Sequence, residues 1–165
     1  VDWLVKAFKE IKGKIPNLKL VIAGGSSATD EYVRELKKLA ENDKRIIFTG
    51  YIVGKEKEEL LSNAFLFILP SYLEGLPIVL LEAMSYRLPC LVSDIPPHKE
   101  VINEEVDGFL FQSNNFSDFV KRLGELLENP RRLRDIGKNA RRKAEREYNW
   151  DEAVRKTEEV YKELV

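Results

Sequence analysis

The sequence predicts a fold of the α/β class, a doubly wound parallel sheet flanked by helices. Short apolar runs of strand length alternate with amphipathic stretches of helical spacing along the chain. Several of these runs are apolar throughout, as strands buried on both faces of a parallel sheet are. The length of 165 residues is that of one domain with one core. Together these observations predict a single Rossmann-like domain.

Composition excludes several classes of partner. Lysine and arginine (27) nearly balance aspartate and glutamate (28), so the chain lacks the broad basic field that drives binding to nucleic acid. No apolar run approaches the roughly 20 residues of a membrane span, and no signal peptide opens the chain. The single cysteine, Cys90, excludes an internal disulfide and fits a reducing compartment. We expect a soluble, cytoplasmic domain with Cys90 buried in a strand.

The charged residues also bear on the source of the protein. They make up 33% of the chain, and glutamine occurs once, at Gln112. Heat-adapted proteins favour Lys and Glu over thermolabile amides, so we expect a thermophilic source. The melting temperature measured by calorimetry should then lie well above the range of about 45–65 °C that mesophile domains show, and a value within that range would contradict the expectation.

The amino-terminal part of the chain is predicted to form three helices separated by two strands. Leu4, Ala7, Phe8 and Ile11 have the spacing of one face of an amphipathic helix. The predicted elements are helix 1–12, strand 18–23, helix 29–41, strand 45–49 and helix 55–62. The last helix is short and charged, and we expect it to be scaffold.

Glycine follows both of these strands, at the point where an open α/β sheet turns its strand ends towards ligand. Gly24 and Gly25 open the run G-G-S, which either lets the backbone approach a ligand closely or forms a plain flexible turn. Tyr51 and Ile52 follow the second strand. Tyr51 is either a stacking residue or ordinary packing.

The stretch from 65 to 82 carries the most specific chemistry. It reads F-L-F-I-L-P-S-Y-L-E-G-L-P-I-V-L-L-E. Residues 65–69 are predicted to be a strand buried on both faces, and Pro77 to be the first residue of a helix, because its missing N–H and fixed φ suit that position. The amides of Ile78 and Val79 would then be free at the positive end of the helix dipole, where an anion such as phosphate binds.

Two acids, Glu74 and Glu82, frame the predicted anion site. Glu74 lies in the loop before the helix, and Glu82 lies three and four residues after the two amides and so on their face of the helix. The spacing also fits a solvated stripe of Glu82, Ser85 and Tyr86, with Glu74 an ordinary loop acid. The apolar residues on both sides of Glu82 favour a ligand or partner, because a charge in that setting needs one unless it is exposed.

The rest of the chain is predicted to add two strands and the closing helices. The expected strands are 89–93 and 109–111, and the expected helices are 116–128, 130–148 and 150 to the end, with breaks at Asn129 and Asn149. His98 lies in the loop after the strand 89–93. Without a second histidine, a cysteine or a clear acid partner beside it, we expect an exposed residue at the start of a helix.

The helix 130–148 carries a run of basic residues that fits either a solvated face or an anionic partner. Acids interleaved at helical spacing, Asp135, Glu145 and Glu147, favour the solvated face. The basic residues are Arg131, Arg132, Arg134, Lys138, Arg141, Arg142 and Lys143.

The run E-G-L-P-I-V-L-L-E-A-M-S-Y-R-L-P resembles the donor-binding motif of retaining glycosyltransferases of the GT-B fold, in particular family 4. That family carries two glutamates separated by seven residues, which are Glu74 and Glu82 here, followed by A-M and then a proline, as Ala83, Met84 and Pro89 are. Other blocks are similar to successive parts of the family's C-terminal domain. They read V-D-W-L-V-K-A-F-K-E-I, L-V-I-A-G-G, I-I-F-T-G-Y-I, P-S-Y-L-E-G, G-F-L-F and N-P-R-R-L-R-D-I-G-K-N-A-R.

The resemblance implies that residues 1–165 are the C-terminal, nucleotide-sugar-binding half of a GT-B enzyme. The family's first strand, the arginine and lysine that bind the donor's phosphates, and the acceptor domain have no counterpart in the sequence. It implies transfer of a hexose from a UDP-, GDP- or ADP-linked donor to a glycan, lipid or small-molecule acceptor, with retention at the anomeric carbon. It also implies no metal and no further cofactor, membrane contact only through the acceptor domain, and no catalysis by these residues alone.

Roles for individual residues are implied as well. Glu82 would hold the ribose hydroxyls of the donor, and Glu74, the catalytic candidate, would contact hydroxyls of the transferred sugar. The other donor-binding candidates are the amides of Gly75, Leu76, Ile78 and Val79, the turn at Gly24 and Gly25, and the base-binding pair Tyr51 and Ile52. Two alternatives stand beside this assignment: a non-catalytic Rossmann-like module that binds a nucleotide or a protein, and a glycogen-synthase-like polymerase.

Overall fold

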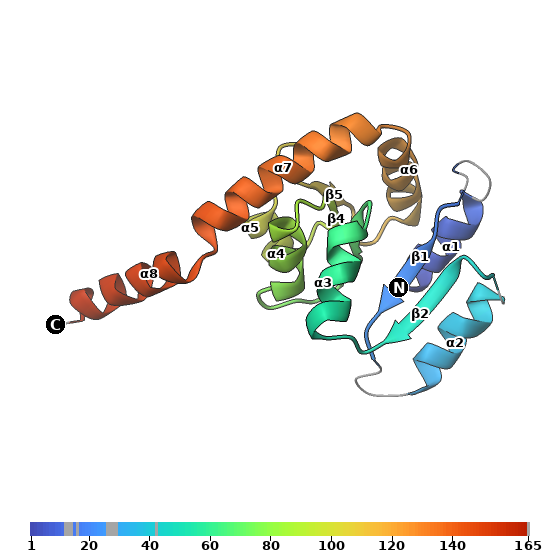
Figure 1. Cartoon of the computed structure of the whole chain (residues 1–165), viewed down its shortest axis with the longest axis horizontal. Coiled ribbons are helices and arrows are strands. Elements are labelled where there is room, and N and C mark those ends of the chain that lie inside the picture. Colours follow the sequence, from blue (N-terminus) through green and yellow to red (C-terminus); the bar gives the residue numbers. More distant parts are fainter. Residues whose placement is uncertain (12–14, 16, 26–29, 42, 165) are drawn as a thin grey trace.

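The computed structural model describes residues 1–165 except 12–14, 16, 26–29, 42 and 165 (Figure 1). Helices and strands alternate from α1 to α6, and two more helices follow, which confirms the predicted α/β class. The elements are α1 (Asp2–Glu10), β1 (Leu20–Ala23), α2 (Asp30–Ala40), β2 (Ile46–Gly50), α3 (Gly54–Asn63), β3 (Phe67–Leu69), α4 (Ile78–Ser85), β4 (Cys90–Ser93), α5 (Pro96–Val101), β5 (Phe109–Phe111), α6 (Phe116–Leu127), α7 (Pro130–Glu147) and α8 (Trp150–Glu163). Ser26 of the G-G-S run, the helix end predicted at Lys12 and the helix start predicted at Thr29 lie outside the described residues.

The five strands of the described part pair in parallel, in two pieces. β1 pairs with β2, and the order β3-β4-β5 makes up the second piece. One apolar core joins them, since Leu20 and Ile46 of the first piece belong to the same buried cluster as Leu91 and Phe109 of the second. The arrangement is therefore Rossmann-like, with helices packed around two short parallel ladders.

β3 is shorter and more exposed than predicted. The strand covers Phe67–Leu69, its three residues are only half-buried, and Phe65 is 43% exposed. The reason is its place at the edge of the three-stranded piece, where only β4 pairs with it. The strand buried on both faces is the central one, β4, whose four residues, Cys90 among them, are all buried. Burial raises the pKa of the Cys90 thiol, so it stays a neutral, inert packing residue.

Asparagine residues cap the starts of the last three helices. Two of them, Asn129 and Asn149, are the positions at which breaks were predicted. The side chains of Asn115, Asn129 and Asn149 accept hydrogen bonds from backbone amides in the first turns of α6, α7 and α8. Each cap satisfies one amide that has no partner inside its own helix. None of the helices formed by the described residues is long and apolar enough to cross a membrane.

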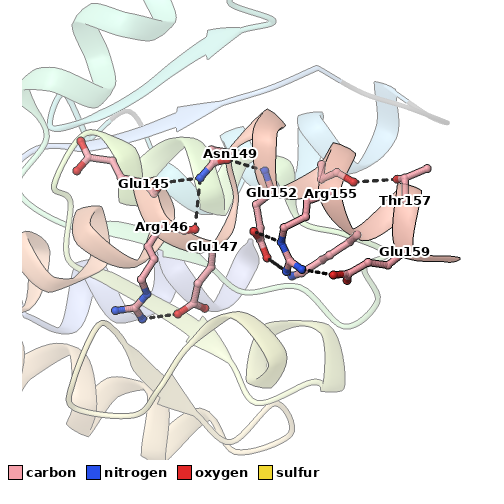
Figure 2. A network of polar contacts seen from close by, with 10 residues as sticks. Glu145, Arg146, Glu147, Asn149, Glu152, Arg155, Thr157 and Glu159 are labelled. Carbon is pink, nitrogen blue, oxygen red and sulfur yellow. Dashed lines mark hydrogen bonds and ion pairs between the residues drawn. The ribbon is translucent and has the colours of Figure 1, made fainter. Parts of the chain in front are cut away.

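The final helix, α8, extends away from the rest of the domain (Figure 1). It has no buried residue along its length, and Trp150 at its start is 86% exposed. Local polar contacts shape its junction with α7, where the side-chain amide of Asn149 donates to the backbone carbonyls of Glu145 and Arg146 (Figure 2). α8 is therefore ordered by its own hydrogen bonds and ion pairs and not by the domain core.

The basic run of α7 is for the most part the solvated face that was predicted. Lys138 pairs with Asp135 and Arg141 with Glu145 along the helix, and these four side chains are all exposed or half-buried. Lys143 departs from the prediction, because it is buried and its ammonium lies 3.3 Å from the carboxylate of Asp107. The turn of the helix places Lys143 on its buried side, beside Ala140 and Ala144.

Candidate functional site

The candidate site lies at the carboxyl ends of β3 and β4, where the loop 70–77 leads into α4. The helix begins one residue later than predicted, because Pro77 is its N-cap and not its first helical residue. At φ −77° and ψ 79°, Pro77 is the centre of a tight turn across which Ile78 N donates to Leu76 O at 2.9 Å. The buried proline thus fixes the direction in which the helix leaves the loop.

This turn changes which amides are available. The amide of Ile78 is already engaged with Leu76 O, so its role towards a ligand stays a prediction that requires that bond to break. The amides of Gly75, Leu76 and Val79 have no acceptor among the described residues. Because Val79 lies in the first turn of α4, its N–H points out of the positive end of the helix dipole. The loop and the helix start therefore offer three backbone donors to an anion.

Glu74 is tied to the ends of two strands. Its Oε1 accepts a hydrogen bond from Ser71 Oγ at 2.7 Å, just after β3. Ser71 O in turn accepts from Ser93 Oγ, the last residue of β4, at 2.5 Å. The two serines were missed by sequence reasoning, although serine at the carboxyl end of a strand is a signal that could have found them. They hold the loop so that Glu74 stays half-buried near the sheet.

Glu82 has the partner that its apolar setting required. Lys57 Nζ, on α3, lies 2.6 Å from Glu82 Oε1, and both side chains are about one third exposed, at 35% and 34%. The hydrogen bond to Glu82 raises the pKa of Lys57, and the phenols of Tyr51 and Tyr86 act in the same direction. α3 was expected to be scaffold only. The structure instead brings its Lys57 to the predicted site.

His98 is buried, so the expectation of an exposed residue was wrong. Its side chain has no exposed surface, and its Nδ1 lies 2.8 Å from Ser93 O, an atom that can only accept. The proton is therefore assigned to Nδ1, and Nε2 is a buried acceptor without a partner in the described residues. Burial lowers the pKa of His98, although the bond to Ser93 and the charge of Glu74 oppose the shift. A neutral imidazole thus braces α5 against the strand end that holds Glu74.

Gly24 ends β1 in a conformation that favours glycine, with φ at 132°. Its amide donates to Gly50 O at 2.9 Å, which links the carboxyl ends of β1 and β2. The Cα of Gly25 faces Tyr51, since a Cβ built there would lie 3.9 Å from Tyr51 Cβ. Tyr51 is 81% exposed and Ile52 is half-buried, so the Tyr51 ring is free to meet a ligand and does not pack in the core. Stacking by Tyr51 stays a prediction.

The predicted residues thus fall into two groups along one edge of the molecule. Glu74 lies with the loop amides and the serines after β3 and β4. Glu82 lies on α4 and pairs with Lys57 of α3. Among the described residues, no group of histidine, cysteine and acidic side chains is arranged to hold a metal ion.

A parallel α/β domain with acids and free amides gathered at the carboxyl ends of its strands is of the Rossmann-like class, whose ligand sites lie at that edge. Residues 1–143 match the family model described as Glycosyl transferases group 1, and the chain belongs to this family.

Individual relatives agree with this family. UDP-Gal:alpha-D-GlcNAc-diphosphoundecaprenol alpha-1,3-galactosyltransferase of Escherichia coli is 31% identical over 155 residues, which are 92% of this chain and 38% of the relative. The crystal structure of HepE from Anabaena in complex with UDP and glucose has a TM-score of 0.82 at 18% identity, covering 98% of this chain and 43% of HepE. The C-terminal domain of LpcC from Francisella tularensis, a glycosyl transferase group 1 family protein, has a TM-score of 0.78 at 22% identity.

The chain spans less than half the length of the curated relatives that it matches, and 38% of the galactosyltransferase. By contrast, the match with the separately crystallised C-terminal domain of LpcC covers 90% of this chain and 79% of that domain. The likeness therefore concerns one part of these longer proteins.

Proposed function

We propose that residues 1–165 form the C-terminal donor-binding domain of a retaining, family 4 type GT-B glycosyltransferase, which binds the nucleoside diphosphate of a sugar donor at the start of α4. The observation that carries the proposal is the set of three free backbone amides in the loop and first turn of α4, with Glu74 in the same loop and Glu82 on the same helix. Acids suit the hydroxyls of ribose and sugar, and amides at a helix start suit the diphosphate between them.

In this proposal each group has one task. Glu82 accepts hydrogen bonds from the ribose hydroxyls, and Glu74 accepts from hydroxyls of the transferred sugar. The amides of Gly75, Leu76 and Val79 donate to the sugar and the diphosphate. Because these donors are fixed before the donor sugar binds, they stabilise the charge that develops on the leaving diphosphate without a titrating base. Gly24, Gly25, Tyr51 and Ile52 would hold the base in this proposal.

The donor class follows from the names of similar proteins and not from the site itself. The E. coli galactosyltransferase is named for a UDP-galactose donor, and HepE was crystallised with UDP and glucose. They support a UDP-linked hexose, with GDP and ADP as the alternatives to test. Neither a metal nor a cofactor enters the proposal.

The whole enzyme, in the proposal, needs a second domain that supplies the acceptor site. The similarity to a C-terminal domain crystallised on its own supports the assignment of this chain to such a domain. We expect the acceptor, a glycan, lipid or small molecule, and any membrane contact to belong to that second domain. We expect residues 1–165 alone to bind the donor but to catalyse no sugar transfer. The compartment proposed for the protein is the cytoplasm.

A thermal-shift screen tests the proposal. UDP, GDP, ADP and their sugar conjugates are added to the chain and to its Glu82→Ala variant. At a nucleotide concentration near ten times Kd the stabilisation should be about 1.4 kcal/mol, a rise in melting temperature of about 3 °C. The rise should disappear in Glu82→Ala because the ribose loses its acceptor.

The matched control is Glu58→Ala, which removes the same charge from an exposed position of α3 and should keep the rise. If no nucleotide stabilises the chain, or if Glu82→Ala responds as the wild type does, the donor-site assignment fails. The non-catalytic module is then the better description.

A further inference from the structure

The donor site as proposed leaves one charged side chain without a task. Lys57 lies on α3, outside the loop and helix that carry the two glutamates, yet its Nζ is 2.6 Å from Glu82 Oε1. We propose that Lys57 is a positioning residue of the site, which fixes the Glu82 carboxylate for the ribose hydroxyls. This inference rests on the proposed function.

The first step of the argument is the hydrogen-bond capacity of Glu82. A carboxylate accepts at about four lone-pair positions, two on each oxygen. Lys57 donates to Oε1, and no other described residue donates to either oxygen. Glu82 therefore keeps enough acceptor capacity for two ribose hydroxyls while it is held by Lys57. The ion pair does not have to break for ligand to bind.

The second step concerns the freedom of the side chain. A glutamate on the surface of a helix samples several rotamers, and fixing one of them costs conformational entropy. The backbone of Glu82 is fixed, because Leu80, Ala83 and Met84 on the same helix are fully buried. Lys57 comes from a different helix and holds the carboxylate end. The part of Glu82 that must meet a ligand is thereby placed before the ligand arrives.

A structural role for the pair is a weak explanation. Both side chains are about one third exposed, and exposed ion pairs typically contribute only about 0–1 kcal/mol to folding. α3 buries Leu61 in the core whether or not Lys57 is present. Lys57 contacts the carboxylate of Glu82, which the proposed function assigns to the ribose. Its surroundings are thus the predicted ligand site and not the core.

A rival role is purely electrostatic, since an ammonium beside Glu82 also offsets a negative charge near a bound diphosphate. The two roles differ in what they act on. Neutralisation affects every nucleoside diphosphate equally, whereas positioning acts through the ribose hydroxyls. The preference for a ribonucleotide over its 2′-deoxy counterpart therefore separates them.

The experiment measures Kd by NMR titration for UDP, GDP and ADP and for the corresponding 2′-deoxynucleoside diphosphates. A hydrogen bond to a charged acceptor predicts that the wild type prefers the ribose form of its nucleotide by about tenfold. In Lys57→Met this preference should fall to about twofold or less, because a mobile carboxylate must be ordered by the ligand itself. Lys57→Arg keeps a donor and should restore most of it.

The control is Lys55→Met, which removes the same charge from an exposed position on α3 and should leave the preference unchanged. Two results overturn the inference while leaving the donor site intact: a full ribose preference in Lys57→Met, or an equal loss of affinity for both sugar forms. If the wild type shows no ribose preference and Glu82→Ala binds as well as it does, the proposed function itself is overturned, and the role of Lys57 with it.

Discussion

Gly137→Ala should lower the free energy of unfolding by about 3 kcal/mol or more, because α7 crosses the turn after α4 without room for a side chain. A Cβ at Gly137 would lie 2.1 Å from Arg87 O and 3.0 Å from Arg87 C. These are backbone atoms and cannot swing aside. Arg87 itself has a φ of 63°, so the turn has little freedom to adapt. Urea unfolding followed by circular dichroism measures the loss.

Gly124→Ala is the matched control, because it is the other glycine within a long helix. A Cβ at Gly124, in α6, would meet no atom within 4 Å. Alanine there should stabilise the protein by about 0.5–1 kcal/mol through its higher helix propensity. Equal effects of the two substitutions would show that helix propensity and not close contact governs both sites.

The same contact bears on the candidate site. Small residues of α7, Gly137, Ala140 and Ala144, are all buried on the face towards α4. They let α7 approach the end of the helix whose first turn carries the free amide of Val79 and whose middle carries Glu82. The position of α4, and hence of both groups, depends on this close packing.

Lys143→Met should lower the free energy of unfolding by about 3–5 kcal/mol, because it leaves the Asp107 carboxylate buried without its countercharge. The two side chains are 7% and 4% exposed, and their charged atoms lie 3.3 Å apart. Lys143 Nζ also donates to Val101 O at 2.5 Å, which closes the end of α5. Methionine keeps most of the stem volume, so the loss measured in urea is chiefly that of the charge and its hydrogen bonds.

Two comparisons isolate the buried charge. Lys138→Met breaks an exposed pair with Asp135 on the same helix and should change stability by less than about 0.5 kcal/mol. Adding Asp107→Asn to Lys143→Met should recover part of the loss, because no unpaired charge then stays buried. The single variant Asp107→Asn is measured as well. If its loss in free energy of unfolding simply adds to that of Lys143→Met in the double variant, the explanation by a buried unpaired charge is ruled out.

The order of elements followed from the sequence because it depends on local pattern. The core-facing side of α1 is indicated by the helical spacing of Leu4, Ala7 and Phe8. The burial of β4 is indicated by its apolar run. The motif around Glu74 and Glu82 was predictable for a similar reason, since it lies within one loop and one helix. The exposure of β3 was not, because a strand's place at an edge is decided by its partners and not by its own residues.

The rest of the candidate site could not be predicted because it depends on contacts between distant segments. Lys57 and Glu82 are 25 residues apart, and nothing in the charged pattern of α3 marks one lysine over another. His98 follows two prolines and resembles a surface residue at a helix start, yet α5 folds back so that its ring meets Ser93. Lys143 has the spacing of its solvated neighbours, and only the position of Asp107 explains its burial.

The central claim is that a nucleoside diphosphate binds at the start of α4. An NMR titration of the ¹⁵N-labelled chain with UDP, GDP and ADP tests it most directly, because each backbone amide reports on its own surroundings. The account predicts that one nucleotide gives its largest shift changes at Gly75, Leu76 and Val79, and that Glu82→Ala weakens them. No change with any nucleotide, or the largest changes on a distant face, such as the hollow lined by Glu10, Val120 and Glu125 of α1 and α6, would contradict it.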